Sequence, residues 1–227
     1  MVYITGDIHR DFDRVSEFCD MVGTSQDEDI MIVLGDAMIN YYLNRDDEVL
    51  KQEISEYPIT FFFIHGNHEQ RPYMIDSYEE IEWHRGLAYA EQDYPSLIFA
   101  KDGEIYDFDG KKAIAIGGAY SIDKFSRDQW FETEQPNDII MAFVEQQLAK
   151  VNWQINYVFS HTVPDKFRPA EVFLPNVNQE RIDTSTEEWL DSIEDKLDYD
   201  RWFAGHYHCD TRIDRLTIMY MEFDELW

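Results

Sequence analysis

Five short runs of β-branched and aromatic residues recur along the chain, and each is followed within two residues by a polar cluster that contains Gly or Ser. The runs span residues 2–5, 30–34, 59–64, 157–159 and 202–204. Runs of this length and composition predict buried strands. Because the functional loops of a layered α/β fold gather at one edge of its sheet, the repeated pattern predicts one polar site shared by distant parts of the chain.

Amphipathic helices are predicted between these runs, because apolar residues recur there at spacings of three and four. The predicted helices cover residues 12–22, 140–148 and 189–197. Ser185 and Glu188 have the spacing of a capping box, which predicts where the last helix begins. The alternation of strands and helices therefore indicates a layered α/β domain.

Part of the sheet system is predicted to be antiparallel. Asp109 and Gly110 stand between two strand-like segments, and this pair is typical of a hairpin turn. Residues 216–223 predict a further strand. Three stretches are irregular and rich in aromatic residues: 71–100, 120–136 and 164–185. We interpret them as the rim of a pocket or as core residues under long loops.

Composition narrows the class of protein. The length favours one domain over residues 1–227. Nineteen basic and 47 acidic side chains give a net charge of -28, which disfavours binding to nucleic acid or anionic lipid. No apolar stretch approaches the length of a membrane helix, no signal peptide is expected, and the two isolated cysteines fit a reducing compartment. We therefore expect a cytoplasmic protein, and no obligate protein partner is inferred.

The polar residues after the five runs include five of the seven histidines, a concentration that favours a shared site over scattered packing. These residues are Asp7, His9, Asp36, Asn67, His68, His161, His206 and His208. Residues two apart in an extended segment point to the same side, so Asp7 can converge with His9, and His206 with His208. Adjacent residues point apart, which predicts different roles for Asn67 and His68.

Carboxylate, imidazole and carboxamide groups without a thiolate suit Mn²⁺, with Fe, Zn²⁺ and Ni²⁺ as alternatives. Seven such ligands are too many for one tetrahedral ion but suffice for two divalent ions that share a carboxylate and a water. Two divalent ions outweigh the charges of Asp7, Asp36 and a bridging hydroxide. The pocket would therefore be locally positive and able to bind a phosphoryl group.

The polar clusters occur in an order that resembles the calcineurin-like metallophosphoesterase superfamily, in particular its small bacterial and phage members. The resemblance is carried by Asp7-x-His9, Gly35-Asp36, Gly66-Asn67-His68-Glu69, Ser160-His161 and Gly205-His206-x-His208. It implies a four-layer α/β metallophosphoesterase fold, in which two mixed β-sheets pack as a sandwich flanked by α-helices.

The same resemblance implies a role for each residue. Asp7, His9 and His208 would hold one metal ion, Asn67, His161 and His206 would hold the second, and Asp36 would bridge them. His68 would bind the phosphate and donate a proton to the departing oxygen while a metal-bridging hydroxide attacks phosphorus.

One motif departs from the larger subfamilies. Protein Ser/Thr phosphatases and dinucleoside tetraphosphatases of this superfamily continue Gly-Asp as Gly-Asp-x-x-Asp-Arg-Gly, whereas this chain has Ile39, Asn40 and Tyr41 at the last three positions. The arginine that grips phosphate is missing there. We expect Arg127, with Tyr120 nearby, to replace it, and Arg45 and Arg71 are alternatives.

The sequence therefore favours a dinuclear-metal-dependent phosphoesterase that acts on a phosphomonoester or a phosphodiester. A small phosphate ester, a nucleotide and a phosphoprotein all remain open as substrates. The alternatives are a protein Ser/Thr phosphatase, a dinucleoside polyphosphate hydrolase, a nuclease, which the charge disfavours, and a catalytically silent scaffold of the same fold. His65 and His84 are expected to be structural, and the charged clusters at 27–29 and 45–48 are expected to be solvated.

Overall fold

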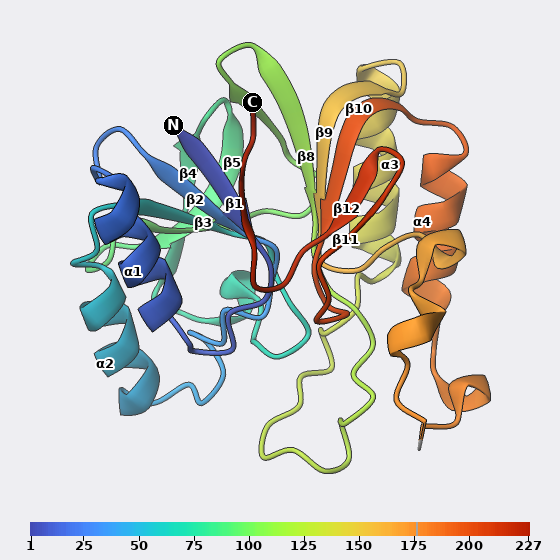
Figure 1. Cartoon of the computed structure of the whole chain (residues 1–227), viewed down its shortest axis with the longest axis horizontal. Coiled ribbons are helices and arrows are strands. Elements are labelled where there is room, and N and C mark those ends of the chain that lie inside the picture. Colours follow the sequence, from blue (N-terminus) through green and yellow to red (C-terminus); the bar gives the residue numbers. More distant parts are fainter. Residues whose placement is uncertain (176) are drawn as a thin grey trace.

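A computed structural model describes residues 1–175 and 177–227. Two β-sheets pack face to face, and α-helices cover the outer face of each (Figure 1). This arrangement confirms the predicted four-layer α/β fold with two mixed sheets. The predicted domain 1–227 and the predicted loop 164–185 both include residue 176, which lies outside the described residues.

The two sheets differ in size. The seven-stranded sheet has the order β13 (Phe223–Glu225), β1 (Val2–Thr5), β2 (Ile30–Val33), β3 (Thr60–Phe63), β6 (Leu97–Ala100), β5 (Gly86–Glu91) and β4 (Tyr78–Trp83). The six-stranded sheet has the order β11 (Thr211–Ile213), β12 (Leu216–Ile218), β10 (Asp198–Ala204), β9 (Gln154–Ser160), β8 (Lys111–Ile116) and β7 (Ile105–Phe108).

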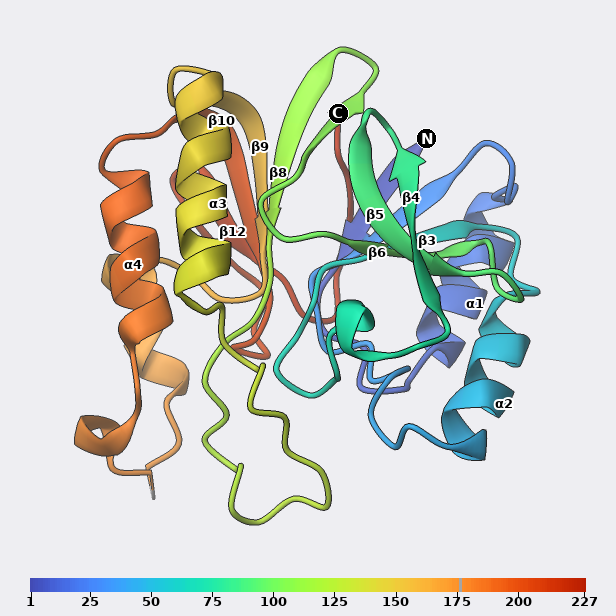
Figure 2. The ribbon, with the colours of Figure 1, turned by 180° about the vertical axis from the view of Figure 1, so that it is seen from behind.

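The helices divide between the two outer faces. On the seven-stranded sheet lie α1 (Asp13–Val22) and α2 (Arg45–Ile54), and on the six-stranded sheet lie α3 (Asp138–Lys150) and α4 (Ser185–Glu194) (Figures 1 and 2). Short 3₁₀ helices occur at η1 (Pro72–Met74), η2 (Asp165–Phe167), η3 (Ala170–Val172) and η4 (Gln179–Arg181). None of the helices within residues 1–175 and 177–227 combines the length and apolar character that crossing a bilayer requires.

Alternation along the strands gives each sheet an apolar cluster on both of its faces. Ile4 and Phe62 point into the sandwich, where they belong to the same apolar cluster as Phe159 of the other sheet. Their neighbours Tyr3 and Phe61 belong to the cluster that α1 covers. Both faces of the central strands are thus buried, which explains why these strands read as continuous apolar runs.

The direction of the strands places their polar exits together. Strands β1, β2 and β3 are parallel to one another, and so are β8, β9 and β10 in the other sheet. Their carboxyl ends lie on the side from which the long loops after β8 and β9 extend, at the bottom of Figure 1. The Asp109-Gly110 turn joins antiparallel β7 and β8, and both residues have positive φ, so the predicted hairpin is confirmed.

Three local predictions were wrong. Residues 71–100 contain β4, β5 and β6 instead of an irregular rim. Residues 216–223 divide between β12 and β13, which belong to different sheets. Helix α4 begins at Ser185 and has Thr184 as its N-cap residue, so the predicted capping box centred on Ser185 does not form.

Candidate functional site

The exits of β1, β2, β3, β9 and β10 meet at one place between the two sheets. The backbone N–H of His206 donates to Asp7 Oδ1 over 2.8 Å, although the two residues are 199 positions apart. The backbone N–H of His68 donates to Asp36 Oδ1 over 2.8 Å. Each carboxylate is therefore oriented by a loop from elsewhere in the chain.

Glycines at the strand exits allow this close approach. A Cβ on Gly35 would lie 2.1 Å from His161 Nδ1, and a Cβ on Gly205 would lie 2.2 Å from Asp7 Oδ1. Gly35 also has a φ of +105°, a backbone conformation that residues other than glycine rarely adopt. Gly35, Gly66 and Gly205 therefore provide room for His161, Asp36 and Asp7, respectively.

One half of the site contains Asp7, His9 and His208, whose candidate ligand atoms all lie within 4.8 Å of one another. The Nε2 atoms of His9 and His208 are 2.8 Å apart, and Asp7 Oδ2 is 3.2 Å from His208 Nε2. Asp7 Oδ2 is buried and has no hydrogen-bond partner among the described residues. Buried polar atoms are rarely left unpaired, so this oxygen fits a cation ligand.

The other half contains Asn67, His161 and His206. His161 Nδ1 is 2.7 Å from the carbonyl oxygen of Leu34, which can only accept, so Nδ1 carries a hydrogen. Asn67 Nδ2 donates to Ser121 Oγ over 2.9 Å, which leaves its Oδ1 facing the histidines. Asn67 Oδ1 is 2.8 Å from His161 Nε2 and 3.0 Å from His206 Nδ1.

These contacts indicate a cation. His161 Nε2 faces Asn67 Oδ1, which can only accept, so the positive charge between them comes either from a proton on Nε2 or from a metal ion. Two acceptors at 2.8 Å repel each other unless a proton or a metal ion supplies positive charge between them. The donor set therefore fits a metal, since Asn67 is held with its oxygen toward the site.

Asp36 lies between the two halves. Its Oδ2 is 3.8 Å from His9 Nε2, and its Oδ1 is 3.6 Å from His161 Nε2. Asp36 also forms a second candidate group with Asp7 and His161, with ligand atoms within 4.8 Å of one another. Asp36 thus faces one histidine of each half.

The surroundings of Asp7, His9 and His206 shift the pKa of each of these residues. Burial raises the pKa of Asp7, but the neighbouring imidazoles of His208 and His9 outweigh burial and hold that pKa well below its ordinary value. Burial lowers the pKa of His9, but Asp7 and Asp36 outweigh it and raise that pKa to about 9. Burial, followed by the charge of His161, lowers the pKa of His206 to about 3. Asp7 is therefore ionised and His206 neutral, which are the forms that bind metals.

Several of these residues adopt strained backbone conformations. The φ values are 47° for His9, 48° for Asp36, 69° for His206 and 48° for His208. Residues other than glycine rarely adopt this left-handed region, and each such residue costs about 1–3 kcal/mol. The fold holds these side chains in place at the expense of local backbone stability, as is common at functional sites.

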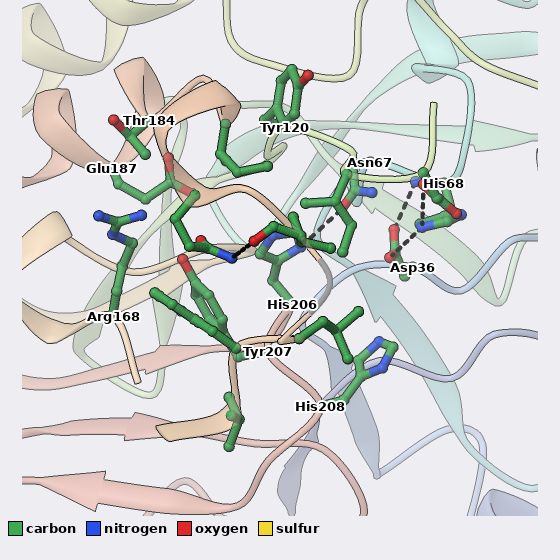
Figure 3. Close-up of a pocket in the computed structure, with 18 of the residues that line it drawn as sticks. Asp36, Asn67, His68, Tyr120, Arg168, Thr184, Glu187, His206, Tyr207 and His208 are labelled. Carbon is green, nitrogen blue, oxygen red and sulfur yellow. Dashed lines mark hydrogen bonds and ion pairs between the residues drawn. The ribbon is translucent and has the colours of Figure 1, made fainter. Parts of the chain in front are cut away.

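A cavity of about 560 Å³ opens above the site (Figure 3). Asp36, Asn67, His68, His206 and His208 line its inner part. Its outer wall is mostly apolar and comes from the loops after β8 and β9, through Ile122, Val172, Phe173, Leu174, Val177 and Ile182. The cavity therefore joins a polar floor to an apolar wall.

Of the two predicted phosphate-binding residues, Tyr120 and Arg127, one lines the cavity and the other contacts His68. Tyr120 lines the cavity. Arg127 instead places its Nη1 atom 3.0 Å from His68 Nδ1, and its Nη2 atom donates to the carbonyl of Asn67 over 3.1 Å. The alternatives lie elsewhere: Arg45 begins α2, and the buried Arg71 pairs with Asp102 beside a different cavity.

Sequence reasoning missed Arg168, Glu187 and Tyr207, which line the cavity beyond the histidines (Figure 3). Glu187 is buried, and its Oε1 accepts from Thr162 Oγ1 over 2.8 Å. No spacing or motif distinguishes these residues, although the predicted rim segment 164–185 contains Arg168 and ends close to Glu187.

His65, His84 and the charged cluster 45–48 were expected to lie outside the functional site. His65 is buried and lies beside the second cavity, and His84 contacts the carbonyl of Asp107 between two strands. The charged cluster 45–48 is not wholly solvated, because Asp47 is buried and accepts from Arg10 over 2.6 Å. That cluster forms the first turn of α2, a helix that the sequence did not predict.

Comparison with known proteins gives a family match and similar solved structures. Residues 1–210 match the model of the calcineurin-like phosphoesterase family. No curated protein is significantly similar to the chain. The crystal structure of TT1561 from Thermus thermophilus is similar in fold, with a TM-score of 0.55, 8% sequence identity, and coverage of 96% of this chain and 87% of that one.

A second solved structure is a Staphylococcus aureus protein named as a candidate 5′-nucleotidase, in complex with alpha-ketoglutarate. It has a TM-score of 0.47 and 14% identity, over 96% of this chain and 48% of its own, so this chain spans about half its length. The family match covers residues 1–210 of 227. The chain belongs to the calcineurin-like phosphoesterase family.

Proposed function

We propose that this protein hydrolyses small organic phosphate esters with the help of two divalent metal ions, of which Mn²⁺ is the first to test. The proposal rests above all on one observation: Asp36 lies between two groups of candidate ligand atoms, and each group turns an acceptor oxygen toward imidazole nitrogens. Asp7 Oδ2 has no partner among the described residues, and Asn67 Oδ1 is 2.8 Å from His161 Nε2.

The two halves would divide the ligands. Asp7, His9 and His208 would hold the first ion, Asn67, His161 and His206 would hold the second, and Asp36 would contact both. When bound, such a pair of ions lowers the pKa of a shared water and neutralises charge on a phosphoryl group. The protein's own contribution is to fix these ligands through Leu34, Ser121 and the backbone N–H groups of the loops.

His68 would act on the opposite side of the phosphoryl group from the attacking water. Its Nε2 is 3.9 Å from Asp36 Oδ2, which is too long for a hydrogen bond, so the ring remains able to contact a substrate oxygen. We propose that His68 binds the phosphoryl group and assists the departing oxygen. Assistance of this kind is typically worth about 10²- to 10⁴-fold in rate.

The cavity supports a small organic leaving group. Its apolar outer wall would contact an aromatic or aliphatic body, while Glu187, Thr184 and Arg168 supply polar groups at the far side from His68 (Figure 3). A nucleotide combines these features, with a planar base and hydrogen-bonding edges. We therefore place nucleotides ahead of phosphoproteins in the proposed substrate class.

A metal-reconstitution experiment tests the proposal. Protein freed of metal by a chelator is loaded with Mn²⁺, its bound ions are counted by mass spectrometry, and it is assayed on p-nitrophenyl phosphate and the bis ester. Nucleotide and phosphopeptide panels follow. We expect two ions per chain and hydrolysis of at least one ester class, and the ratio between the esters separates monoesterase from diesterase activity.

Two variants sharpen the test. His68→Ala should retain both ions and lose about 10²-fold or more in turnover. His84→Ala is the matched control, because His84 lies between two strands outside the cavity. Binding of fewer than two ions, or failure to hydrolyse every ester tested, would overturn the proposed function, and an unchanged rate in His68→Ala would remove that residue's role.

A further inference from the structure

We infer that Arg127 is a positioning residue, which fixes the tautomer and orientation of His68 so that the ring hydrogen sits on Nε2 and faces the substrate. This inference rests on the proposed function for its catalytic consequence. The tautomer of His68 in the metal-free protein can be tested independently of whether the protein is an enzyme.

The tautomer follows from the chemistry of the two partners. A guanidinium group has only donors and stays protonated in proteins. Arg127 Nη1 is 3.0 Å from His68 Nδ1, so Nδ1 must accept and cannot carry a hydrogen. A neutral imidazole has one hydrogen, which is therefore on Nε2.

Arg127 is itself held firmly. Its side chain is only 6% exposed, and Nη2 donates to Glu134 Oε2 over 3.2 Å and to the carbonyl of Asn67 over 3.1 Å. Glu134 is buried and accepts a second hydrogen bond from Trp130 Nε1 over 2.7 Å. A buried charge with several partners has few alternative positions, so Arg127 presents Nη1 to His68 in a defined direction.

The hydrogen on Nε2 has no partner within the protein's described residues. Nε2 lies 3.9 Å from Asp36 Oδ2 and 3.9 Å from Asp123 Oδ1, and both distances exceed hydrogen-bond range. His68 lines the cavity above the candidate metal ligands. The free Nε2–H is therefore available to an oxygen of a bound phosphoryl group.

The contact also limits the chemistry of His68. While Arg127 occupies Nδ1, the ring stabilises negative charge by donating a hydrogen bond from Nε2. The neutral ring keeps this hydrogen, and the departing oxygen takes its proton from solvent. Arg127 thus favours the hydrogen-bonding role at rest, and it should matter most for esters whose departing oxygen most needs assistance.

Nitrogen NMR tests the inference directly. In metal-free, ¹⁵N-labelled protein, long-range proton–nitrogen spectra report the tautomer of each histidine, and His68→Ala assigns the His68 signals. We expect the Nε2–H form in the unmodified protein. Arg127→Met should shift His68 toward a mixture of tautomers, and Arg127→Lys should largely restore the Nε2–H form. Arg168→Met is the control, because it removes a positive charge from the same cavity without touching His68.

Kinetics of the Mn²⁺-loaded protein supply a second readout. Arg127→Met should lower kcat by about 10²-fold on alkyl phosphates and by less on p-nitrophenyl phosphate, with two ions still bound and KM little changed. An Nδ1–H tautomer in the unmodified protein would overturn the inference, even if the enzyme is active and Arg127→Met fails to fold. The expected tautomer together with no hydrolysis of any ester would instead refute the proposed function alone.

Discussion

His9 and His208 place their Nε2 atoms 2.8 Å apart, although 199 residues separate them in the chain. At that distance one nitrogen must carry a hydrogen, because two lone pairs would repel. Burial lowers the pKa of His9, but Asp7 and Asp36 outweigh burial and raise it to about 9. In the metal-free protein the pair therefore holds a proton at neutral pH.

We predict that metal binding displaces this proton. Below about pH 9 the apparent affinity for the first Mn²⁺ should rise with pH, by about tenfold per unit if one proton is released. Titration calorimetry at pH 7 in two buffers with different heats of ionisation measures the number of protons released. The value should be near one for the unmodified protein and lower for His9→Gln. Equal proton release in both proteins would contradict the prediction.

A glycine comparison tests whether close packing of the loops builds the site. Gly35 and Gly23 both have positive φ, +105° and +77°, but a Cβ on Gly35 would lie 2.1 Å from His161 Nδ1, whereas nothing lies within 4 Å of one on Gly23. Gly23→Ala should therefore cost only about 1 kcal/mol of stability, from its left-handed backbone. Gly35→Ala should cost more and also displace His161.

The measurements are chemical denaturation and counting of bound Mn²⁺. Gly23→Ala should bind as many ions as the unmodified protein, and Gly35→Ala should bind fewer. If the two variants lose the same stability and retain the same ions, the approach of Gly35 to His161 does not matter for the site.

That these polar side chains lie close together could be predicted from sequence, because they follow buried strands that run parallel within each sheet. Asp7 and His9 do converge, with His9 Nε2 3.7 Å from Asp7 Oδ2, but His9 has a φ of 47°, so their convergence depends on the turn after β1 and not on strand alternation alone. The apolar runs before them are buried on both faces, which made the strands recognisable.

Strand β4, the contact between Arg127 and His68, and the position of Glu187 could not be predicted from local sequence patterns. Strand β4 is an edge strand whose acidic residues Glu79, Glu80 and Glu82 keep it exposed, so the stretch resembles a loop in sequence. The contact of Arg127 with His68 depends on how the loop after β8 folds back. Glu187, on α4, accepts a hydrogen bond from Thr162 after β9, and no spacing in the sequence indicates this contact.

Glu69 should make stability depend on pH. Its Oε1 accepts from the backbone N–H of Gly66 over 3.1 Å, and its side chain is buried. Burial, followed by the charge of Asp36, raises its pKa from the ordinary 4.5 to about 8. Between these two pH values the folded chain keeps a proton that the unfolded chain releases, so this contribution to stability is full below pH 4.5 and is lost as pH rises through about 8.

We therefore predict that metal-free protein becomes less stable from about pH 5 to about pH 9, as measured by chemical denaturation. Glu69→Gln should reduce the slope, since the amide cannot ionise. Other groups, such as His9, contribute in the same direction, so the difference between the two proteins is the relevant quantity. Glu79→Gln, on an exposed position of β4, should leave the slope unchanged. A Glu69→Gln profile parallel to that of the unmodified protein would exclude this role of Glu69.

Glu187 should select among leaving groups. Its side chain is buried at the cavity wall, Oε1 accepts from Thr162, and Oε2 has no hydrogen-bond partner among the described residues. Burial raises the pKa of Glu187, while the hydrogen bond from Thr162 opposes that shift. An unpaired buried carboxyl oxygen favours a ligand that supplies an N–H or O–H donor, such as the amino group of a nucleobase.

We predict that Glu187→Gln lowers kcat/KM for AMP, relative to kcat/KM for p-nitrophenyl phosphate, by about tenfold. A hydrogen bond to a charged group is worth about 1.5–3 kcal/mol, and the amide of glutamine retains part of that energy. Glu188→Gln is the control, since Glu188 is the next residue of α4 but is exposed and contacts Thr184. Competition by adenosine, which has no phosphate, should weaken in Glu187→Gln to the same extent. If the ratio stays the same in both variants, Glu187 does not contact the leaving group, and the apolar wall alone must account for any preference among esters.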